Sequence, residues 1–253
     1  MSSFHTTIDT AEAAAFGTLG VTATLETTFI EAEGIRRTRF QLALQSLDGS
    51  VDTRRLRGLW KTGRLEATEP AHPLLTILRA YQVRRAYLAI QSGGSRYRHL
   101  PVPGTREAVW TYAPGNEGLP GCHGRGEVIR TDDLQAAAAL STVGLPLLMI
   151  EDGPRGRHFY HLPRYGPALP GGAPPVDAVA LLTAWNADKD SLPWATPFAQ
   201  AVRGLHNLAR FHAAIREDIP VILFLKPHST RSALVRSDAS PAAFDQMKQH
   251  FDR

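Results

Sequence analysis

Cysteine is almost absent from this chain, and its scarcity limits the chemistry that the chain can perform. Among 253 residues the only cysteine is Cys122. One thiol cannot form a disulfide within the chain, and a zinc site built mainly from cysteines is excluded. We therefore expect no metal centre and no cofactor, and the default expectation for such a protein is the cytoplasm.

Long apolar runs are also missing. The longest runs, such as residues 145–150, are far shorter than the ~20 residues of a membrane-spanning helix. The N-terminus lacks the basic and apolar regions of a signal peptide. Hydrophobic residues make up 43% of the chain and charged residues 21%, which is typical of a globular protein. The composition predicts a soluble protein without a membrane segment.

Lysine is scarce relative to arginine. Of 28 basic residues only four are lysines, and the remaining 24 are arginines. Arginine is the better residue for bidentate phosphate contacts and for stacking on bases. A GC-rich genome also favours arginine codons, so the ratio alone has a second explanation.

The position of the arginines is more informative than their number. Residues 34–98 contain 13 basic and 4 acidic residues, a balance of +9, within a chain whose net charge is only +4. The rest of the chain therefore carries −5. Codon preference does not explain this asymmetry, and a local excess of positive charge favours an anionic partner.

The N-terminal half has the pattern of antiparallel hairpins joined to short helices. Apolar and polar residues alternate over 21–29 and 37–46, which indicates two half-buried strands. We predict further strands at 84–90, 95–102, 107–112, 145–150 and 157–162. Helices are predicted at 10–15, from 52–53 onward, at 73–82, from a cap at Thr131 to 142, and at 176–186.

The last third contains a long amphipathic helix followed by an apolar strand. Thr196 suits the cap position and Pro197 the first helical position, and apolar residues recur about every 3.6 positions as far as Ile215. Residues 221–225 are all apolar, which is typical of a strand covered on both faces. A final helix is expected after Ser240. The fold class predicted is α+β, with antiparallel hairpins in the N-terminal half and a helix-rich C-terminal part with one buried strand.

One stretch has the composition of a linker. Residues 163–175 contain five prolines and three glycines. We place a domain boundary there, between a basic α+β domain at 1–162 and a helical region with a buried strand at 176–253. The alternative is that 176–253 belongs to the same domain.

The basic segment is the main candidate site. Its arginines are interspersed with aromatic residues, Trp60, Tyr81, Tyr87, Tyr97 and Trp110, whose rings suit stacking on unpaired bases. We predict an arginine-rich protein that binds RNA or single-stranded DNA mainly through phosphate, as a possible subunit of a nucleoprotein complex. The alternatives are a solvated charged surface and an interaction protein with an acidic partner. The predicted nucleic-acid-binding residues are Arg36, Arg37, Arg39, Arg54, Arg55, Arg57, Lys61, Arg84, Arg85, Arg96, Arg98 and Arg125.

A glycine-rich stretch at 113–127 is predicted to be a loop. Its unshielded backbone N–H groups and Arg125 suit an anion, but the spacing fits neither the dinucleotide-binding nor the P-loop pattern. Cys122 and His123 are neighbours in sequence, and neighbouring side chains tend to point apart, which argues against a nucleophile–base pair. A surface loop is the favoured interpretation.

His228 is the one weak catalytic candidate. The pattern His228-Ser229-Thr230 after an apolar strand is similar to the histidine motifs of phosphodiesterases that cleave through a 2′-hydroxyl. Such enzymes need two copies, and the only other match, His5-Thr6-Thr7, has no apolar strand before it. A small cytosolic hydrolase or metal-independent ribonuclease using His228 is therefore the second functional hypothesis.

Overall fold

The structure is a computed structural model, and it describes residues 4–30, 35–46, 49–62, 72–92, 100–101, 108–109, 128–166, 175–187, 192–217, 221–225 and 232–236. The chain forms two compact units. Unit 1 comprises residues 1–78, 193–196 and 203–253, and unit 2 comprises residues 79–192 and 197–202. Two long helices, α3 (Pro73–Ser92) and α6 (Pro197–Glu217), contribute residues to both units.

Unit 1 is built on a five-stranded antiparallel sheet in the order β1-β3-β2-β9-β10. Strands β2 and β3 form the predicted hairpin, and β9 pairs with β2 although about 190 residues separate them in sequence. The strands are β1 (Phe4–Thr7), β2 (Val21–Ile30), β3 (Ile35–Ser46), β9 (Val221–Leu225) and β10 (Ser232–Arg236).

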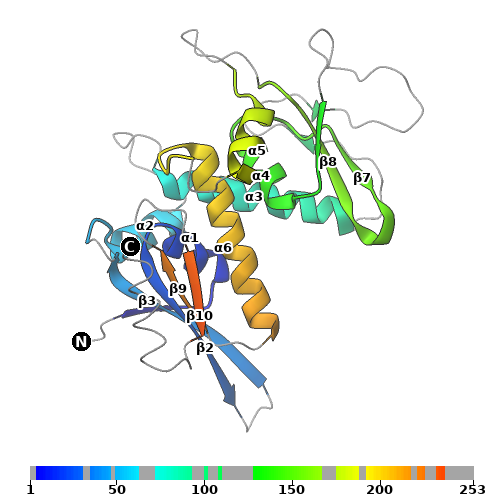
Figure 1. The fold of residues 1–253 in the computed structure, drawn as a ribbon. Helices are drawn as coiled ribbons and strands as arrows, with labels where there is room; N and C mark the ends of the chain where they lie inside the picture. The colour runs from blue at the N-terminus through cyan, green and yellow to red at the C-terminus, as the bar shows by residue number, and fades with distance from the viewer. Residues whose placement is uncertain are drawn as a thin grey trace. The chain divides into compact units, whose positions relative to one another are not determined.

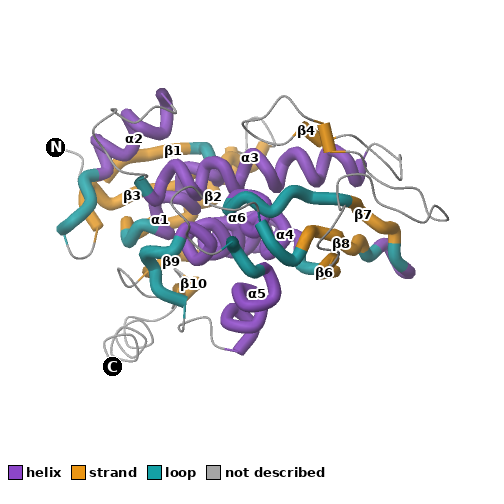
Figure 2. The backbone as a smooth tube through the Cα atoms, turned by 90° about the horizontal axis from the view of Figure 1, so that it is seen from above, coloured by secondary structure: helices purple, strands orange, loops and turns teal. Residues whose placement is uncertain are grey.

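Helices cover one face of this sheet and form the core of unit 1 with it (Figures 1 and 2). Helix α1 (Thr10–Thr18) packs on β2 and β3, and α2 (Thr53–Thr62) packs beside β3. The alternation in β3 buries Phe40, whose ring meets the edge of Phe211 from α6 at 5.0 Å between centroids. Burial of such aromatic rings is the largest single contribution a core residue makes.

Unit 2 combines helices with a three-stranded antiparallel sheet in the order β6-β8-β7. Its helices bury a run of alanines at 136–139 and Trp185. A separate two-stranded ladder pairs β4 with β5. The elements are β4 (Leu100–Pro101), β5 (Ala108–Val109), β6 (Val128–Thr131), α4 (Leu134–Thr142), β7 (Met149–Asp152), β8 (His158–Pro163) and α5 (Ala178–Ala187).

Aspartates begin three of the helices. Asp9 accepts hydrogen bonds from the first N–H groups of α1, Asp133 from those of α4, and Asp177 from those of α5. The carboxylate satisfies N–H groups that have no partner within the helix, and it suits the positive end of the helix dipole. The predicted cap of α4, Thr131, is therefore wrong by two residues: its hydroxyl instead accepts from the N–H of Asp133 at 3.1 Å.

Two predicted strands are wrong in whole or in part. Residues 84–90 continue α3 as a helix, because Ala80 and Tyr87, seven residues apart, are both buried on one helical face. Residues 145–148 are not a strand and β7 begins only at Met149, although Leu145 is buried. Pro146 has no N–H for a ladder.

Side-chain directions on two helices also differ from prediction. The apolar pattern of 176–186 predicts that Val179, Leu182 and Thr183 face inward. In α5 the buried residues are instead Ala178 and Trp185, and Val179 is 40% exposed. The apolar stripe of α6 predicts a core position for His212, but its side chain is exposed. The error in α5 arises because the apolar pattern of a short helix is compatible with several rotations about its axis.

The α+β class is confirmed, with the N-terminal hairpin and the helix-rich C-terminal part in place. Strands β1, β6 and β10 were not predicted from the sequence. The boundary proposed at 163–175 stays a prediction, since 167–174 lie outside the described residues, and so does the final helix after Ser240. None of the helices in the described ranges has the length and hydrophobicity that crossing a bilayer requires.

Candidate nucleic-acid interface

The structure describes the side chains of seven of the twelve predicted binding residues. These are Arg39, Arg54, Arg55, Arg57, Lys61, Arg84 and Arg85. For Arg36 and Arg37 only the backbone position is described, in β3 opposite Phe29 and Thr28. Arg96, Arg98 and Arg125 lie outside the described residues, and so does His228.

Arg57 holds a buried carboxylate. Its Nε donates to Oε1 of Glu12 at 2.9 Å, and the hydroxyl of Thr7 donates to Oε2 at 2.5 Å. The side chain of Glu12 is only 5% exposed, so its oxygens are cut off from water and depend on these two partners for their hydrogen bonds. Arg57 therefore has a structural task that the sequence did not reveal.

Arg39 is paired across the hairpin. Its Nε donates to Oε2 of Glu26 at 2.8 Å, and Gln41 donates to the other oxygen of the same carboxylate. These three residues stand on the sheet face opposite Phe40, where Arg39 remains about half exposed. An exposed pair contributes little to stability, but it cancels much of the positive charge at this position.

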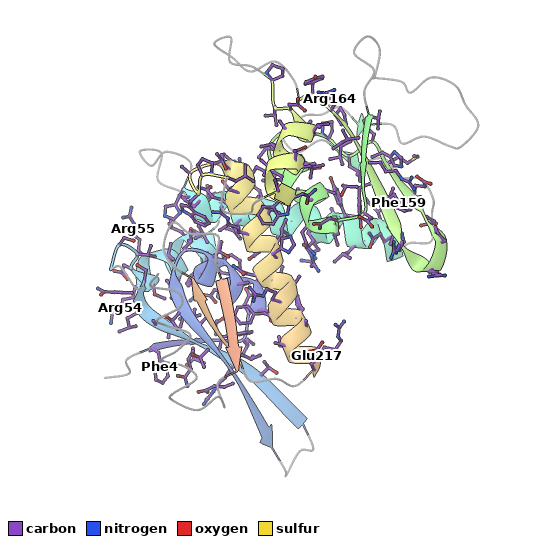
Figure 3. The ribbon with its side chains drawn as sticks, in the orientation of Figure 1. Phe4, Arg54, Arg55, Phe159, Arg164 and Glu217 are labelled. Carbon is purple, nitrogen blue, oxygen red and sulfur yellow. The ribbon has the colours of Figure 1, made fainter. Side chains whose placement is uncertain are left out.

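Helix α2 presents the densest group of exposed cations. Leu56 is buried, and Trp60 donates from its indole N–H to Asp9 at 3.1 Å, which orients the opposite side of the helix towards solvent. That side carries Arg54, Arg55 and Lys61, all exposed, and Figure 3 shows Arg54 and Arg55 extending away from the ribbon. We call these three residues the α2 basic face.

The α2 basic face has two further properties. Helix α2 contains no acidic residue, and the carboxylate of Asp52 at its start accepts from the N–H of Arg54 at 2.8 Å. Gly58 lies between the cations, and an added Cβ there would meet nothing within 4 Å. The centre of the face is therefore open to a close approach by another molecule.

His72 lies near Arg55 and is uncharged. Burial lowers the pKa of its imidazole, and the positive charge of Arg55 lowers it further. Its Nδ1 accepts from the N–H of Leu74 at 3.2 Å, at the start of α3. The ring is therefore neutral at neutral pH and contributes no charge of its own.

The charge asymmetry of the sequence predicts that six of these arginines share one exposed face, and the structure describes part of that set: Arg36, Arg37, Arg39, Arg54, Arg55 and Arg57. The hydroxyl of Thr53 bonds to the carbonyl of Ala43, which places the start of α2 at one end of β3. Arg37 lies six residues earlier along β3, roughly 20 Å away at the spacing of a strand. Arg54, Arg55 and Lys61 come together, Arg39 and Arg57 have carboxylate partners, and the part played by Arg36 and Arg37 stays a prediction.

Two of the aromatic residues expected to stack on bases are inaccessible. Tyr81 and Tyr87 are 8% and 3% exposed, and Trp60 packs its ring edge-on to Phe16 at 6.3 Å. The remaining two candidates, Tyr97 and Trp110, lie outside the described residues. Stacking on this set is therefore not supported, and phosphate contact remains the chemistry that the exposed side chains offer.

Unit 2 contains a buried polar cluster that sequence reasoning missed. Tyr87 of α3 stacks on Tyr160 of β8 with centroids 5.9 Å apart and planes at 18°. The hydroxyl of Tyr87 bonds to Ser141, and Gln91 donates to the hydroxyl of Tyr160. Burial raises the pKa of both phenols, that of Tyr160 to about 12. The error that hid this cluster was assigning 84–90 to a strand, because only a helix places Arg84, Tyr87 and Gln91 on one side.

The outer face of the small sheet carries a second polar group. Glu151 accepts from His161 at 2.8 Å and lies 3.5 Å from Arg130, whose guanidinium covers the ring of Phe159 at 3.6 Å. His158 pairs instead with Asp152, so the two histidines of β8 face opposite sides of the sheet. Within the described ranges, no three metal-binding side chains gather at one point.

Comparison with known proteins adds no assignment: no family model, no curated protein and no solved structure matches this chain. The function must therefore be argued from the α2 basic face and the residues around it.

Proposed function

We propose that this protein binds nucleic acid, RNA or single-stranded DNA, through phosphate contacts made by the α2 basic face. The observation that carries the proposal is the exposure of Arg54, Arg55 and Lys61 on one side of a helix that contains no acidic residue. Three cations on one face attract a polyanion and release its counterions. The bare position at Gly58 allows a backbone phosphate to approach the helix between them.

The charges of residues near this helix support the same proposal. Two acidic residues near this helix are paired with other arginines: Glu12 with Arg57, and Glu26 with Arg39. Since the contacts proposed are to phosphate and not to base edges, the binding is expected to be weakly sequence-specific.

A salt titration tests the proposal. Fluorescence anisotropy of a labelled single-stranded RNA is measured from about 50 to about 200 mM salt, because log K falls with log[salt] at a slope near −0.7Z for Z neutralised phosphates. The triple variant Arg54→Ala, Arg55→Ala, Lys61→Ala should flatten this slope by about 2 units.

The matched control removes three exposed arginines elsewhere. Arg155→Gly, Arg157→Ala and Arg216→Ala change the net charge by the same amount, with glycine at 155 because the backbone there has a φ of 62°. The control should retain the wild-type slope. If it flattens the slope as much as the α2 triple variant does, or if neither changes it, the α2 basic face is not the binding surface.

A further inference from the structure

Arg84 is a half-buried cation of unit 2 without a carboxylate partner among the described residues. It lies on α3, and its Nε is fully buried with no hydrogen-bond acceptor in the described part of the chain. A guanidinium cannot lose its proton at any ordinary pH. Its partial burial therefore leaves a positive charge and a donor uncompensated, which costs free energy unless an acceptor arrives.

Tyr160 supplies a second donor in the same unit. Its side chain is 2% exposed, and its oxygen already accepts from Gln91. No acceptor for its own hydroxyl proton is found in the described ranges, whereas the hydroxyl of Tyr87 is satisfied by Ser141. Arg84, Tyr87 and Gln91 lie on one side of α3, and Tyr87 and Gln91 both contact Tyr160, which places Arg84 beside the same tyrosine. Burial raises the pKa of Tyr160, as does the nearby carboxylate of Asp133, whereas the hydrogen bond from Gln91 and the positive charge of Arg84 lower it.

We propose that Arg84 and the hydroxyl of Tyr160 form an oxyanion site in unit 2 that takes a phosphate group. A planar guanidinium binds two oxygens of an oxyanion side by side. A tetrahedral phosphate has further oxygens outside that plane, and one of them can accept from the hydroxyl of Tyr160 on β8. A carboxylate has only two oxygens, and the guanidinium engages both. This site is separate from the α2 basic face, so either can fail without the other.

The first test is a titration of the full chain with inorganic phosphate at constant ionic strength, in which the melting temperature is measured at each phosphate concentration. A ligand that binds only the folded state raises that temperature with concentration. Arg84→Gln should weaken the apparent affinity by about tenfold or more, because a charge-assisted hydrogen bond is lost. Tyr160→Phe, which keeps the ring that stacks on Tyr87, should weaken it severalfold.

Arg85→Gln is the matched control. Arg85 is the next residue of the same helix, it is exposed, and its substitution removes the same charge. Phosphate affinity of this variant should stay within about twofold of wild type. Equal losses in Arg84→Gln and Arg85→Gln, or no phosphate effect on the wild type, would overturn the proposal.

A second measurement covers the case in which Arg84→Gln does not fold. The buried Nε–H of Arg84 should give a slowly exchanging arginine resonance in the wild-type NMR spectrum, identified by its absence from Arg84→Lys. Phosphate should shift this resonance, and an unshifted resonance at saturating phosphate contradicts the site.

The source of the phosphate is settled by competition. If the ligand is a phosphate of nucleic acid, inorganic phosphate should displace labelled single-stranded RNA and Arg84→Gln should weaken RNA binding while Arg85→Gln does not. If the ligand is free phosphate, inorganic phosphate still raises the melting temperature of the wild type, and Arg84→Gln leaves the affinity for RNA unchanged. Both results support the site and distinguish its two sources.

Discussion

At Glu12 a carboxylate lies inside unit 1, and its partners come from two other elements. Thr7 reaches it from the end of β1 and Arg57 from α2. A charge in such a position is tolerated only while both partners remain, because the folded protein has replaced its hydration by two directed contacts. The residue therefore couples β1, α1 and α2.

We expect Arg57→Ala to lower the free energy of unfolding by about 3 kcal/mol, since it leaves the carboxylate of Glu12 buried without its cation. Arg54→Ala, three residues away and exposed, should change it by less than about 0.5 kcal/mol. Urea denaturation of both variants measures the difference. Equal and small effects would show that Glu12 is not held by Arg57 in solution.

The tyrosine pair of unit 2 predicts a loss of stability at alkaline pH. Tyrosines ionise near pH 10 in the unfolded chain, whereas the pKa of Tyr160 is raised to about 12 in the folded protein. Between these values the folded state holds a proton that the unfolded state has released, so stability falls as pH rises from about 10 to about 12. Tyr87, whose pKa is also raised, acts in the same direction.

Denaturation at about pH 9 and at about pH 11 measures this fall. In Tyr160→Phe the fall should be smaller than in wild type, because one of the two groups is removed. Tyr165→Phe, which alters an exposed tyrosine, is the control and should behave as wild type. A fall in Tyr160→Phe as steep as that of the wild type would contradict the assignment.

At the scale of elements, two glycines in helices have opposite requirements. A Cβ on Gly204 of α6 would lie 2.7 Å from Cγ2 of Ile77 on α3, closer than real atoms approach. A Cβ on Gly58 of α2 would meet nothing within 4 Å. One glycine is required by packing, and the other lowers the stability of its helix.

Gly204→Ala should therefore lower the free energy of unfolding by about 1–3 kcal/mol through overpacking. Gly58→Ala should raise it by about 0.5–1 kcal/mol, because alanine loses less backbone entropy in a helix. The two variants carry the same chemical change and serve as controls for each other in a single series of thermal melts. A Gly204→Ala protein as stable as wild type would mean that α3 and α6 are not in close contact at Ile77.

The elements that the sequence predicted well are those with long and regular patterns. The hairpin of β2 and β3, the helix that begins at Pro197 and the strand at Val221 all follow from periodicity and capping. The strand assigned to 84–90 failed because a short alternation of Ala86, Leu88 and Ile90 also occurs in a helix. A pattern over only seven residues does not distinguish a helix from a strand.

The site was less predictable than the fold, for a physical reason. Sequence identifies an arginine but not its partner: Arg57 and Arg54 are alike in the printed chain, yet one holds Glu12 and the other faces solvent. The partner of Arg57 is 45 residues away. Contacts of that range depend on the packing of α1 against α2, which no local pattern encodes.

At the scale of the whole molecule, unit 1 is assembled from both ends of the chain. Asn207 of α6 donates to the hydroxyl of Thr18 at 3.0 Å in a fully buried position, and Phe211 packs on Phe40. Strand β9 supplies the other neighbour of β2. The N-terminal residues alone therefore lack a large part of their core.

A chain shortened to residues 1–162 should not unfold cooperatively. It loses Phe211, Asn207 and strand β9, so the apolar face that carries Phe40 is left exposed to water. Thermal melts followed by circular dichroism, with the full chain as control, measure this. A sharp transition in the shortened chain would show that 1–162 is a domain in its own right.

The pairing of β2 with β9 has a consequence for biosynthesis. Thr18 and Asn207 are 189 residues apart, so the ribosome needs roughly 10–40 s after making the first to make the second. During that interval the edge of β2 that β9 will occupy is bare, and an unpaired edge is a template for aggregation. Unit 1 therefore completes its fold only after most of the chain has been translated, and until then its N-terminal hairpin carries an unpaired strand edge.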